Sequence, residues 1–319
     1  MDDRLDDGTI GPPPPWLEAA LAEEPEPVTT EVDGTRIASL AWGQRESPTV
    51  VLIHGGAAHA RWWSAVAPSL ARHFRVVALD LSGHGDSGWR DLYRTEVWGE
   101  EVLAAADAAG GTERPLVIGH SMGGLVTIGL AAKYGAELAG AVVLDAPVRR
   151  PDPESEEGRA GRMFRDPKTY PDLRTAMEHF HLVPPQPCDN PWLLEFVART
   201  SLRPMTDGWT WKFDPRVFAA RAGATAPSDF GAQLARAACR LAIVNGERST
   251  VVDDRVRADI VELLADAPAA QAGVPVVEVP EAYHHLLLDQ PIALVTALRG
   301  VLAAWRPIGR PPADIEVNA

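Results

Sequence analysis

Five consecutive residues, Gly119-His120-Ser121-Met122-Gly123, are the stretch of this sequence best suited to covalent chemistry. They stand between an apolar run, PLVI, and a helical pattern, LVTIGLAAKYG. In a strand–turn–helix context, G-x-S-x-G predicts a turn so tight that the residues two before and two after the serine must be very small. Such a turn strains the serine backbone and projects its hydroxyl above the sheet. The pattern therefore predicts a nucleophilic Ser121; the alternative is a glycine-rich turn with an ordinary capping serine.

A nucleophilic serine needs a neighbouring base, because a hydroxyl is a weak nucleophile at neutral pH. Of the nine histidines in the chain, His284 and His285 follow the last predicted strand, VPVVEVP. Adjacent side chains cannot both reach one hydroxyl, so we expect only one of them to be the base. His54, His84 and His120 flank glycine-rich turns, where a scaffolding role explains them.

A carboxylate must orient the base and stabilise the imidazolium that forms. Asp253 and Asp254 are explained as the cap and first turn of a helix through ADIVELL. Two candidates remain, Glu247 near the end of the CRLAIVNG strand and Asp145 at the end of the AGAVVLD strand. The second strand lies beside the nucleophile strand, so its tip can approach the histidine loop. We expect Asp145 to be the acid, with Glu247 as the alternative.

Strands and helices must alternate to bring these residues together. A hairpin with an Asp-Gly turn is predicted near residues 28–43. Apolar runs then follow in PTVVLIHGG, FRVVALDLSGHGDSG, PLVIGHSMGG, AGAVVLDAP, CRLAIVNG and VPVVEVP, mostly with helical patterns between them. This alternation predicts an α/β fold, a mostly parallel central sheet with helices on both faces.

The interval 148–237 breaks this rhythm. It is rich in proline, charge and aromatic residues and contains no convincing buried strand. Because a loop of that length is implausible in a compact domain, we predict a helical cap insertion over one end of the sheet. The core is then 28–147 and 238–306. An extended N-terminal arm, compatible with one short helix at WLEAALAEE, occupies 1–27, and a C-terminal tail occupies 307–319.

Composition limits the partners. The 319 residues carry a net charge of −14, which argues against nucleic acid or an anionic membrane. No apolar run of about 18 residues is present, and the acidic N-terminus does not read as a signal peptide. Two separated cysteines make no disulfide framework, and His179 and His181 lack a third metal ligand nearby. We expect a cytoplasmic protein without metal or cofactor.

Together these motifs resemble the α/β-hydrolase fold family from about residue 28 to 306. The resemblance rests on the serine turn, on His54-Gly55-Gly56, on the DLSGHGDSG loop and on the late AYHHLLLDQP. It implies that His284 is the base, that Met122 N–H is one oxyanion donor, and that Gly56 N–H is the second, with the neighbouring Ala57 as an alternative. One departure is Ser82, where many relatives carry arginine.

The resemblance also bears on the acid. Relatives often place an aspartate where Ser249 stands, but some take the acid from the earlier strand, as Asp145 would allow. The implied function is a serine hydrolase of a carboxylic ester or lactone. A set of tryptophans in the insertion and near the oxyanion loop favours an apolar or aromatic substrate. These are Trp62, Trp63, Trp192, Trp209 and Trp211.

Two other functions remain open. Relatives with the same triad hydrolyse carbon–carbon bonds of diketone-type ring-cleavage products, and others have become non-catalytic ligand-binding proteins. Epoxide hydrolase and haloalkane dehalogenase chemistry are disfavoured, because those relatives carry aspartate where Ser121 stands.

Overall fold

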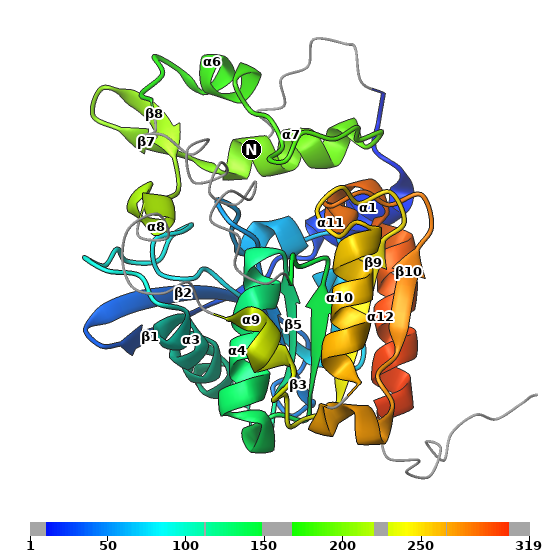
Figure 1. Cartoon of the computed structure of the whole chain (residues 1–319). Helices are drawn as coiled ribbons and strands as arrows, with labels where there is room; N and C mark the ends of the chain where they lie inside the picture. The colour runs from blue at the N-terminus through cyan, green and yellow to red at the C-terminus, as the bar shows by residue number, and fades with distance from the viewer. Residues whose placement is uncertain (1–10, 112, 149–167, 220–228, 266, 306–319) are drawn as a thin grey trace, which may run out of the picture.

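An eight-stranded sheet forms the centre of the protein (Figure 1). The computed structural model describes residues 11–111, 113–148, 168–219, 229–265 and 267–305. The strands are β1 (Glu26–Val32), β2 (Thr35–Trp42), β3 (Thr49–Ile53), β4 (Arg75–Leu79), β5 (Leu116–His120), β6 (Gly140–Leu144), β9 (Leu241–Gly246) and β10 (Val276–Val279). Their order is β1-β2-β4-β3-β5-β6-β9-β10, and every pair from β4 to β10 is parallel. The prediction of a mostly parallel α/β sheet is confirmed.

The antiparallel edge follows from the predicted hairpin. Val32 pairs with Thr35, so the turn consists of Asp33 and Gly34. Both have positive φ, 46° and 71°, as a two-residue hairpin turn of the type favoured by right-handed twist requires. β2 then pairs antiparallel with β4 and joins the hairpin to the parallel strands.

Helices cover both faces of the sheet, because successive side chains of each buried strand point to opposite sides. Val51 and Ile53 of β3 belong to one apolar cluster, whereas Val50 and Leu52 belong to the other. The first cluster includes residues of α3 (Thr95–Ala108), α4 (Met122–Lys133), α9 (Phe230–Leu234) and α10 (Asp254–Leu264); α4, α9 and α10 lie in front of the strands in Figure 1. The second includes residues of α1 (Pro15–Ala22), η1 (Ala60–Trp63), α2 (Ala67–Ala71), α11 (Leu286–Asp289) and α12 (Pro291–Trp305).

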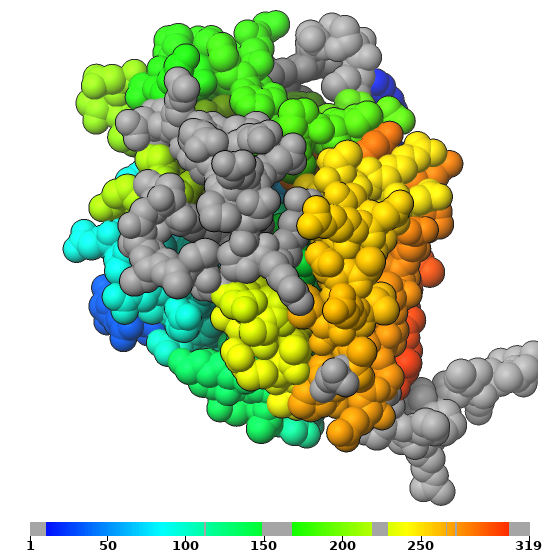
Figure 2. Space-filling model, in the orientation of Figure 1, coloured from blue at the N-terminus to red at the C-terminus, as the bar shows by residue number. Residues whose placement is uncertain are grey.

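The insertion lies across the end of the sheet where the parallel strands finish, at the top of Figures 1 and 2. Its helices are α6 (Leu173–Glu178), α7 (Pro191–Thr200) and α8 (Arg216–Ala219). The predicted bounds 148–237 also include α9, but this helix packs against α4 and α10 of the core instead. The insertion also contains a two-stranded hairpin, β7 (Leu202–Met205) with β8 (Gly208–Trp211), which the expectation of a helical insertion did not include. Residues 149–167 and 220–228 of the predicted cap fall outside the described residues, as does the predicted tail.

The segment DGWTWKFDP, for which the sequence suggested no role, fastens the insertion to the loop after β4. Gly85 N–H donates to the carbonyl of Lys212 at 2.7 Å, and Asp214 N–H donates to the carbonyl of Gly83 at 2.8 Å. The Lys212 ammonium also pairs with Asp86 at 2.9 Å. The end of the β7–β8 hairpin therefore runs along the core loop and fixes one side of the insertion.

At position 82, where many relatives carry arginine, this chain has a serine, and the side chain of Arg90 lies beside it. Its guanidinium reaches Ser82 Oγ at 3.1 Å and forms an ion pair with the fully buried Glu101 at 3.0 Å. Ser82 N–H donates to the other oxygen of that carboxylate at 2.8 Å. A charge supplied from eight residues further along the chain thus holds the loop against α3.

The N-terminal segment packs on the molecule through α1, whose Leu17 is fully buried. Trp42 Nε1–H donates to the carbonyl of Glu23 at 3.1 Å, and Trp192 Nε1–H of α7 donates to the carbonyl of Gly11 at 2.7 Å. From Gly11 onward the predicted arm is therefore attached to both the sheet and the insertion, and residues 1–10 lie outside the described residues. Among the described residues, none of the helices has the length and apolar character needed to cross a membrane.

Candidate active site

The serine turn has the strained geometry that its sequence predicts. Ser121 has φ 54° and ψ −117°, a conformation that costs a non-glycine residue free energy. A Cβ on Gly119 would lie 2.1 Å from the carbonyl oxygen of Gly123, and one on Gly123 would lie 2.5 Å from those of Ile53 and His54. Helix α4 therefore approaches β5 at Gly119 and the end of β3 at Gly123 so closely that only glycine fits on either side of Ser121.

Three predicted residues meet at the carboxyl ends of the parallel strands. His284 Nε2 lies 3.0 Å from Ser121 Oγ, and His284 Nδ1 lies 2.6 Å from Asp145 Oδ2. Because ionised carboxylate oxygens only accept, Nδ1 carries the proton and Nε2 presents its lone pair to the serine hydroxyl. This is the arrangement in which imidazole can remove a proton from a nucleophile while a carboxylate stabilises the resulting imidazolium.

Asp145 is held by a partner that the sequence did not identify. Ser249 Oγ–H donates to Asp145 Oδ2 at 2.6 Å, and Gly246 N–H donates to Oδ1 at 2.9 Å. The position that lacks the expected carboxylate thus supplies a hydroxyl donor to the carboxylate on the neighbouring strand. Glu247, the alternative acid, points away: its Oε2 accepts from the backbone N–H of Glu281 at 2.7 Å.

Two backbone amides are candidates to bind an oxyanion. Met122 is the first residue of α4, so its N–H has no acceptor in its own helix, and the helix dipole favours negative charge there. Within the described ranges, neither Met122 N–H nor Gly56 N–H has a hydrogen-bond acceptor. A Cβ on Gly56 would lie 3.0 Å from the Phe218 ring and 3.9 Å from Met122 Sδ, so both side chains border this spot. Ala57, the alternative donor, has φ 56°.

Buried neutral histidines support the site. His120 Nε2–H donates to the carbonyl of His284 at 2.8 Å, and burial lowers the pKa of His120 to about 3. His54 Nε2 accepts from Leu81 N–H at 3.1 Å, and burial lowers its pKa to about 4. Burial also holds the pKa of His285 well below its ordinary value. These rings stay uncharged at neutral pH, and those of His54 and His120 hold loops through their hydrogen bonds.

The ligand atoms of His120, His284 and His285 lie within 4.8 Å of one another. Two of the three rings already have hydrogen-bonding roles, since His284 bridges Ser121 and Asp145 and His120 holds the histidine loop. The third ring, that of His285, packs against the other two, with centroids 5.8 Å from His120 and 4.9 Å from His284. His179 and His181 are exposed in the insertion, where their Nδ1 atoms contact backbone carbonyls.

The predicted tryptophans divide into core and site neighbours. Trp63 is fully buried in the apolar cluster under η1. The Trp62 ring lies 5.6 Å from the His285 ring and 6.5 Å from Phe180, which in turn lies 6.0 Å from Trp211. An aromatic row thus runs from the histidine loop into the insertion. Trp209 pairs through its backbone with Tyr170, and Trp192 contacts the N-terminal arm.

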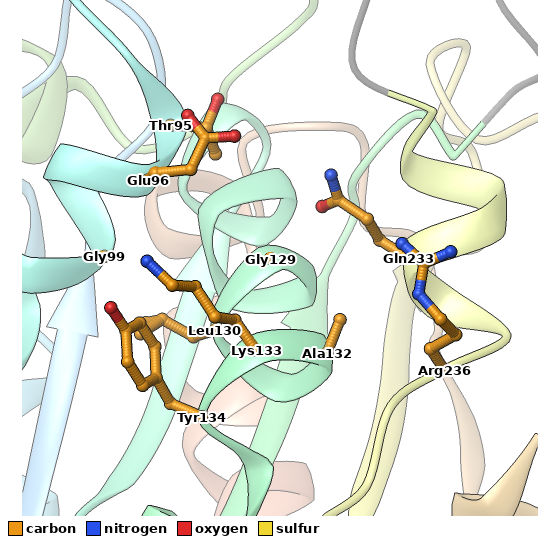
Figure 3. Close-up of a pocket in the computed structure, with 10 residues that line it drawn as sticks. All are labelled: Thr95, Glu96, Gly99, Gly129, Leu130, Ala132, Lys133, Tyr134, Gln233 and Arg236. Atoms are coloured by element: carbon orange, nitrogen blue, oxygen red, sulfur yellow. The ribbon is translucent and has the colours of Figure 1, made fainter.

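A separate surface pocket of about 240 Å³ lies among α3, α4 and α9 (Figure 3). Its polar lining includes Glu96, Lys133, Gln233 and Arg236. Lys133 pairs with Glu100 at 3.5 Å, so its ammonium charge is already partly balanced. Figure 3 shows the pocket along the flank of α4, and it contains none of the residues grouped around Ser121.

Comparisons with known proteins identify the family of the chain. The sequence profile of the alpha/beta hydrolase family matches residues 50–298. The chain is similar to Esterase Rv0045c of Mycobacterium tuberculosis (strain ATCC 25618 / H37Rv), with 30% identity over 295 residues, covering 89% of this chain and 92% of that protein.

Solved structures share the fold at lower identity. E-2-(acetamidomethylene)succinate hydrolase superposes with a TM-score of 0.74 at 19% identity, covering 87% of this chain and all of that one. The thioesterase domain from the curacin biosynthetic pathway gives 0.70 at 21% identity, covering 86% and 99%. With the family profile spanning most of the sequence, the conclusion is plain: this chain belongs to the alpha/beta hydrolase family.

Proposed function

We propose that the protein is a serine hydrolase that cleaves a carboxylic ester or lactone through an acyl-enzyme on Ser121. The observation that carries this proposal is the continuous hydrogen-bonded line from Ser121 Oγ through His284 to Asp145. The similarity to a mycobacterial protein named as an esterase supports an ester as the substrate class.

In the first half of the reaction Ser121 Oγ attacks the carbonyl carbon while its proton passes to His284 Nε2. Asp145 stabilises the imidazolium, and the N–H groups of Met122 and Gly56 stabilise the negative oxygen of the tetrahedral intermediate. The intermediate collapses, and the leaving alkoxide takes the proton from His284. With a lactone, the alcohol released in this step remains attached to the acyl chain.

In the second half, water attacks the acyl-enzyme and gives its proton to His284. Collapse of the second intermediate releases the carboxylic acid and returns the proton to Ser121. The aromatic row of Trp62, Phe180 and Trp211 supports an apolar or aromatic substrate, and we propose that the insertion acts as the cap under which it binds.

The test compares initial rates on p-nitrophenyl acetate, butyrate and octanoate for the wild type and Ser121→Ala. We expect hydrolysis by the wild type and a loss of about 10³-fold or more in kcat for the variant, because the nucleophile is gone. Equal rates in both proteins would overturn the proposal. Gly300→Ala, on α12 with nothing within 4 Å of the added methyl, is the matched control and should hydrolyse like the wild type.

A further inference from the structure

In each of the three consecutive residues 283–285, one backbone group forms a hydrogen bond with a side chain. Tyr283 N–H donates to Asp289 Oδ2 at 2.8 Å, before the histidine. The carbonyl of His284 itself accepts from His120 Nε2–H at 2.8 Å. His285 N–H, after the histidine, donates to Gln186 Oε1 at 2.8 Å.

Gln186 differs from the other two supports because it belongs to the insertion. Asp289 ends α11, and His120 ends β5, so both belong to the core. The amide group of Gln186 also closes the set, since its Nε2 donates to Asp289 Oδ2 at 3.0 Å. One side chain of the insertion therefore bonds to the backbone after the histidine and to the carboxylate that holds the backbone before it.

We propose that Gln186 is a positioning residue that makes the alignment of His284 on Ser121 depend on how the insertion is seated. The inference rests on the proposed function, because it assigns His284 the part of general base. It goes further by identifying a direct connection between the cap and the base.

The hydrogen bonds of Gln186 affect the distance between His284 Nε2 and Ser121 Oγ, on which the proposed reaction rate depends. His284 Nε2 and Ser121 Oγ are 3.0 Å apart, and a misplacement of about 1 Å can cost about 10²-fold in rate. The aromatic contacts run beside the same connection: Phe180, six residues before Gln186, lies 6.5 Å from Trp62, which lies 5.6 Å from His285. A shift of the segment around Gln186 would therefore move the acceptor of His285 N–H.

The charge on Asp289 matters for the test. Burial raises the pKa of Asp289 to about 6, against the opposing effect of the hydrogen bonds from Tyr283 and Gln186. Its Oδ1 is buried and has no partner among the described residues. The titratable group that faces it from the insertion is Cys188, whose thiol pKa burial raises to about 11, so it stays neutral. Above about pH 7 Asp289 is therefore an ionised carboxylate held by two donors.

Two substitutions distinguish the roles of the Gln186 amide oxygen, which accepts from His285 N–H, and the amide nitrogen, which donates to Asp289. Gln186→Met keeps the side-chain length but removes both the acceptor and the donor. We expect kcat on the best p-nitrophenyl ester to fall about tenfold while KM changes less than about twofold, because alignment is lost and binding is not. Gln186→Glu keeps an acceptor for His285 N–H but sets a second carboxylate against Asp289.

The glutamate variant gives a pH signature that a merely structural defect would not. At about pH 8 the two carboxylates repel each other, whereas near about pH 5.5 they can share a proton and restore the bridge. The ratio of its kcat to that of the wild type should therefore rise at least about threefold as pH falls across this range. The same ratio for Gln186→Met should stay flat. Gln44→Met, at an exposed glutamine far from Gln186 in the sequence, is the control, and its kcat should match that of the wild type.

Hydrogen exchange tests the same connection without relying on catalysis. The amide of His285 should exchange at least about tenfold faster in Gln186→Met than in the wild type, with the amides of β5 unchanged, because its acceptor is gone. Wild-type kcat together with wild-type exchange at His285 would overturn the inference. So would a lowered melting temperature with unchanged kcat. If instead the wild type and Ser121→Ala hydrolyse esters equally, the proposed function fails, and the exchange experiment still decides whether Gln186 holds the loop.

Discussion

Single hydrogen bonds distinguish the two carboxylates proposed to orient His284. Asp145 Oδ2 accepts from both His284 Nδ1–H and Ser249 Oγ–H, each at 2.6 Å, and its Oδ1 accepts a backbone amide. Glu247 instead bonds to the backbone of Glu281. The sequence left these two acids as alternatives, and their contacts now support the first.

The choice of acid can be tested with two conservative substitutions. Asp145→Asn should lower kcat by about 10³- to 10⁴-fold, because an amide no longer favours the protonated Nδ1 and cannot balance the imidazolium charge. Glu247→Gln should leave kcat within about twofold, since its loss removes no charge from the histidine. Steady-state kinetics on one ester measure both. A large loss in the second variant and a small loss in the first would reverse the assignment.

For individual residues, the sequence predicted those that belong to a motif but did not reveal the residues that hydrogen-bond to them. Ser121 and His284 were predicted from the spacing of their neighbours and from the family resemblance. Ser249 donates to Asp145, which lies 104 residues earlier in the sequence, and Gln186 accepts from His285, which lies 99 residues later. No local pattern marks such pairs, because they are created by the packing of whole elements.

Close approach between elements explains the glycines of the site. β5 meets α4 at Gly119, and α4 meets the end of β3 at Gly123. β9 meets the histidine loop at Gly246, where a Cβ would lie 2.5 Å from two carbonyl oxygens. Backbone atoms cannot move aside as the end of a flexible side chain can. These glycines therefore set how closely the serine, the acid and the base are brought together.

Alanine substitutions at matched glycines test this account. Gly123→Ala should lower the melting temperature strongly and abolish activity, because the added methyl meets the carbonyls of Ile53 and His54 at 2.5 Å. Gly300→Ala, in the interior of α12 with open space around it, should stabilise the protein by up to about 1 kcal/mol through helix propensity. Thermal unfolding measures both. An equal effect of the two substitutions would show that steric contact is not the cause.

Helices and strands could be predicted where their burial requires a recognisable pattern of apolar residues in the sequence. The apolar runs gave the parallel strands, and Asp33-Gly34 gave the hairpin turn. The β7–β8 hairpin was missed because its strands have four residues each, with only Leu202 and Thr210 buried. Much of its position comes instead from backbone bonds to the β4 loop, which no periodicity in its own residues reveals.

Over the whole molecule, buried titratable groups couple stability to pH. Burial lowers the pKa of five histidines, and each stays neutral when folded but takes up a proton when unfolded below about pH 6.5. The five are His54, His59, His84, His120 and His285. Three buried acids act oppositely, because burial raises their pKa values and the folded state holds their protons more tightly. The pKa rises to about 6 for Asp80 and Asp289, and that of Glu101 lies above its ordinary value.

The five histidines outnumber these three acids, so stability should fall as pH drops from about 6.5 toward 5. Each proton taken up on unfolding changes the free energy of unfolding by about 1.4 kcal/mol per pH unit. Urea unfolding at several pH values measures this slope. His84→Phe, which removes one of the five groups, should reduce the slope by close to one proton. Stability that rises on acidification would contradict the account.

Gly11 and Trp305, the first and last residues that the structure describes, lie toward opposite ends of strand β6. The Trp305 ring, at the end of α12, packs on Gly140 where β6 begins, whereas Asp145 follows the other end of that strand. Gly11, by contrast, is bonded to Trp192 of the insertion. Attaching the protein to a solid support close to Trp305 would therefore leave the end of the sheet that carries Asp145 facing the solution. Attaching it close to Gly11 would place the support next to the insertion.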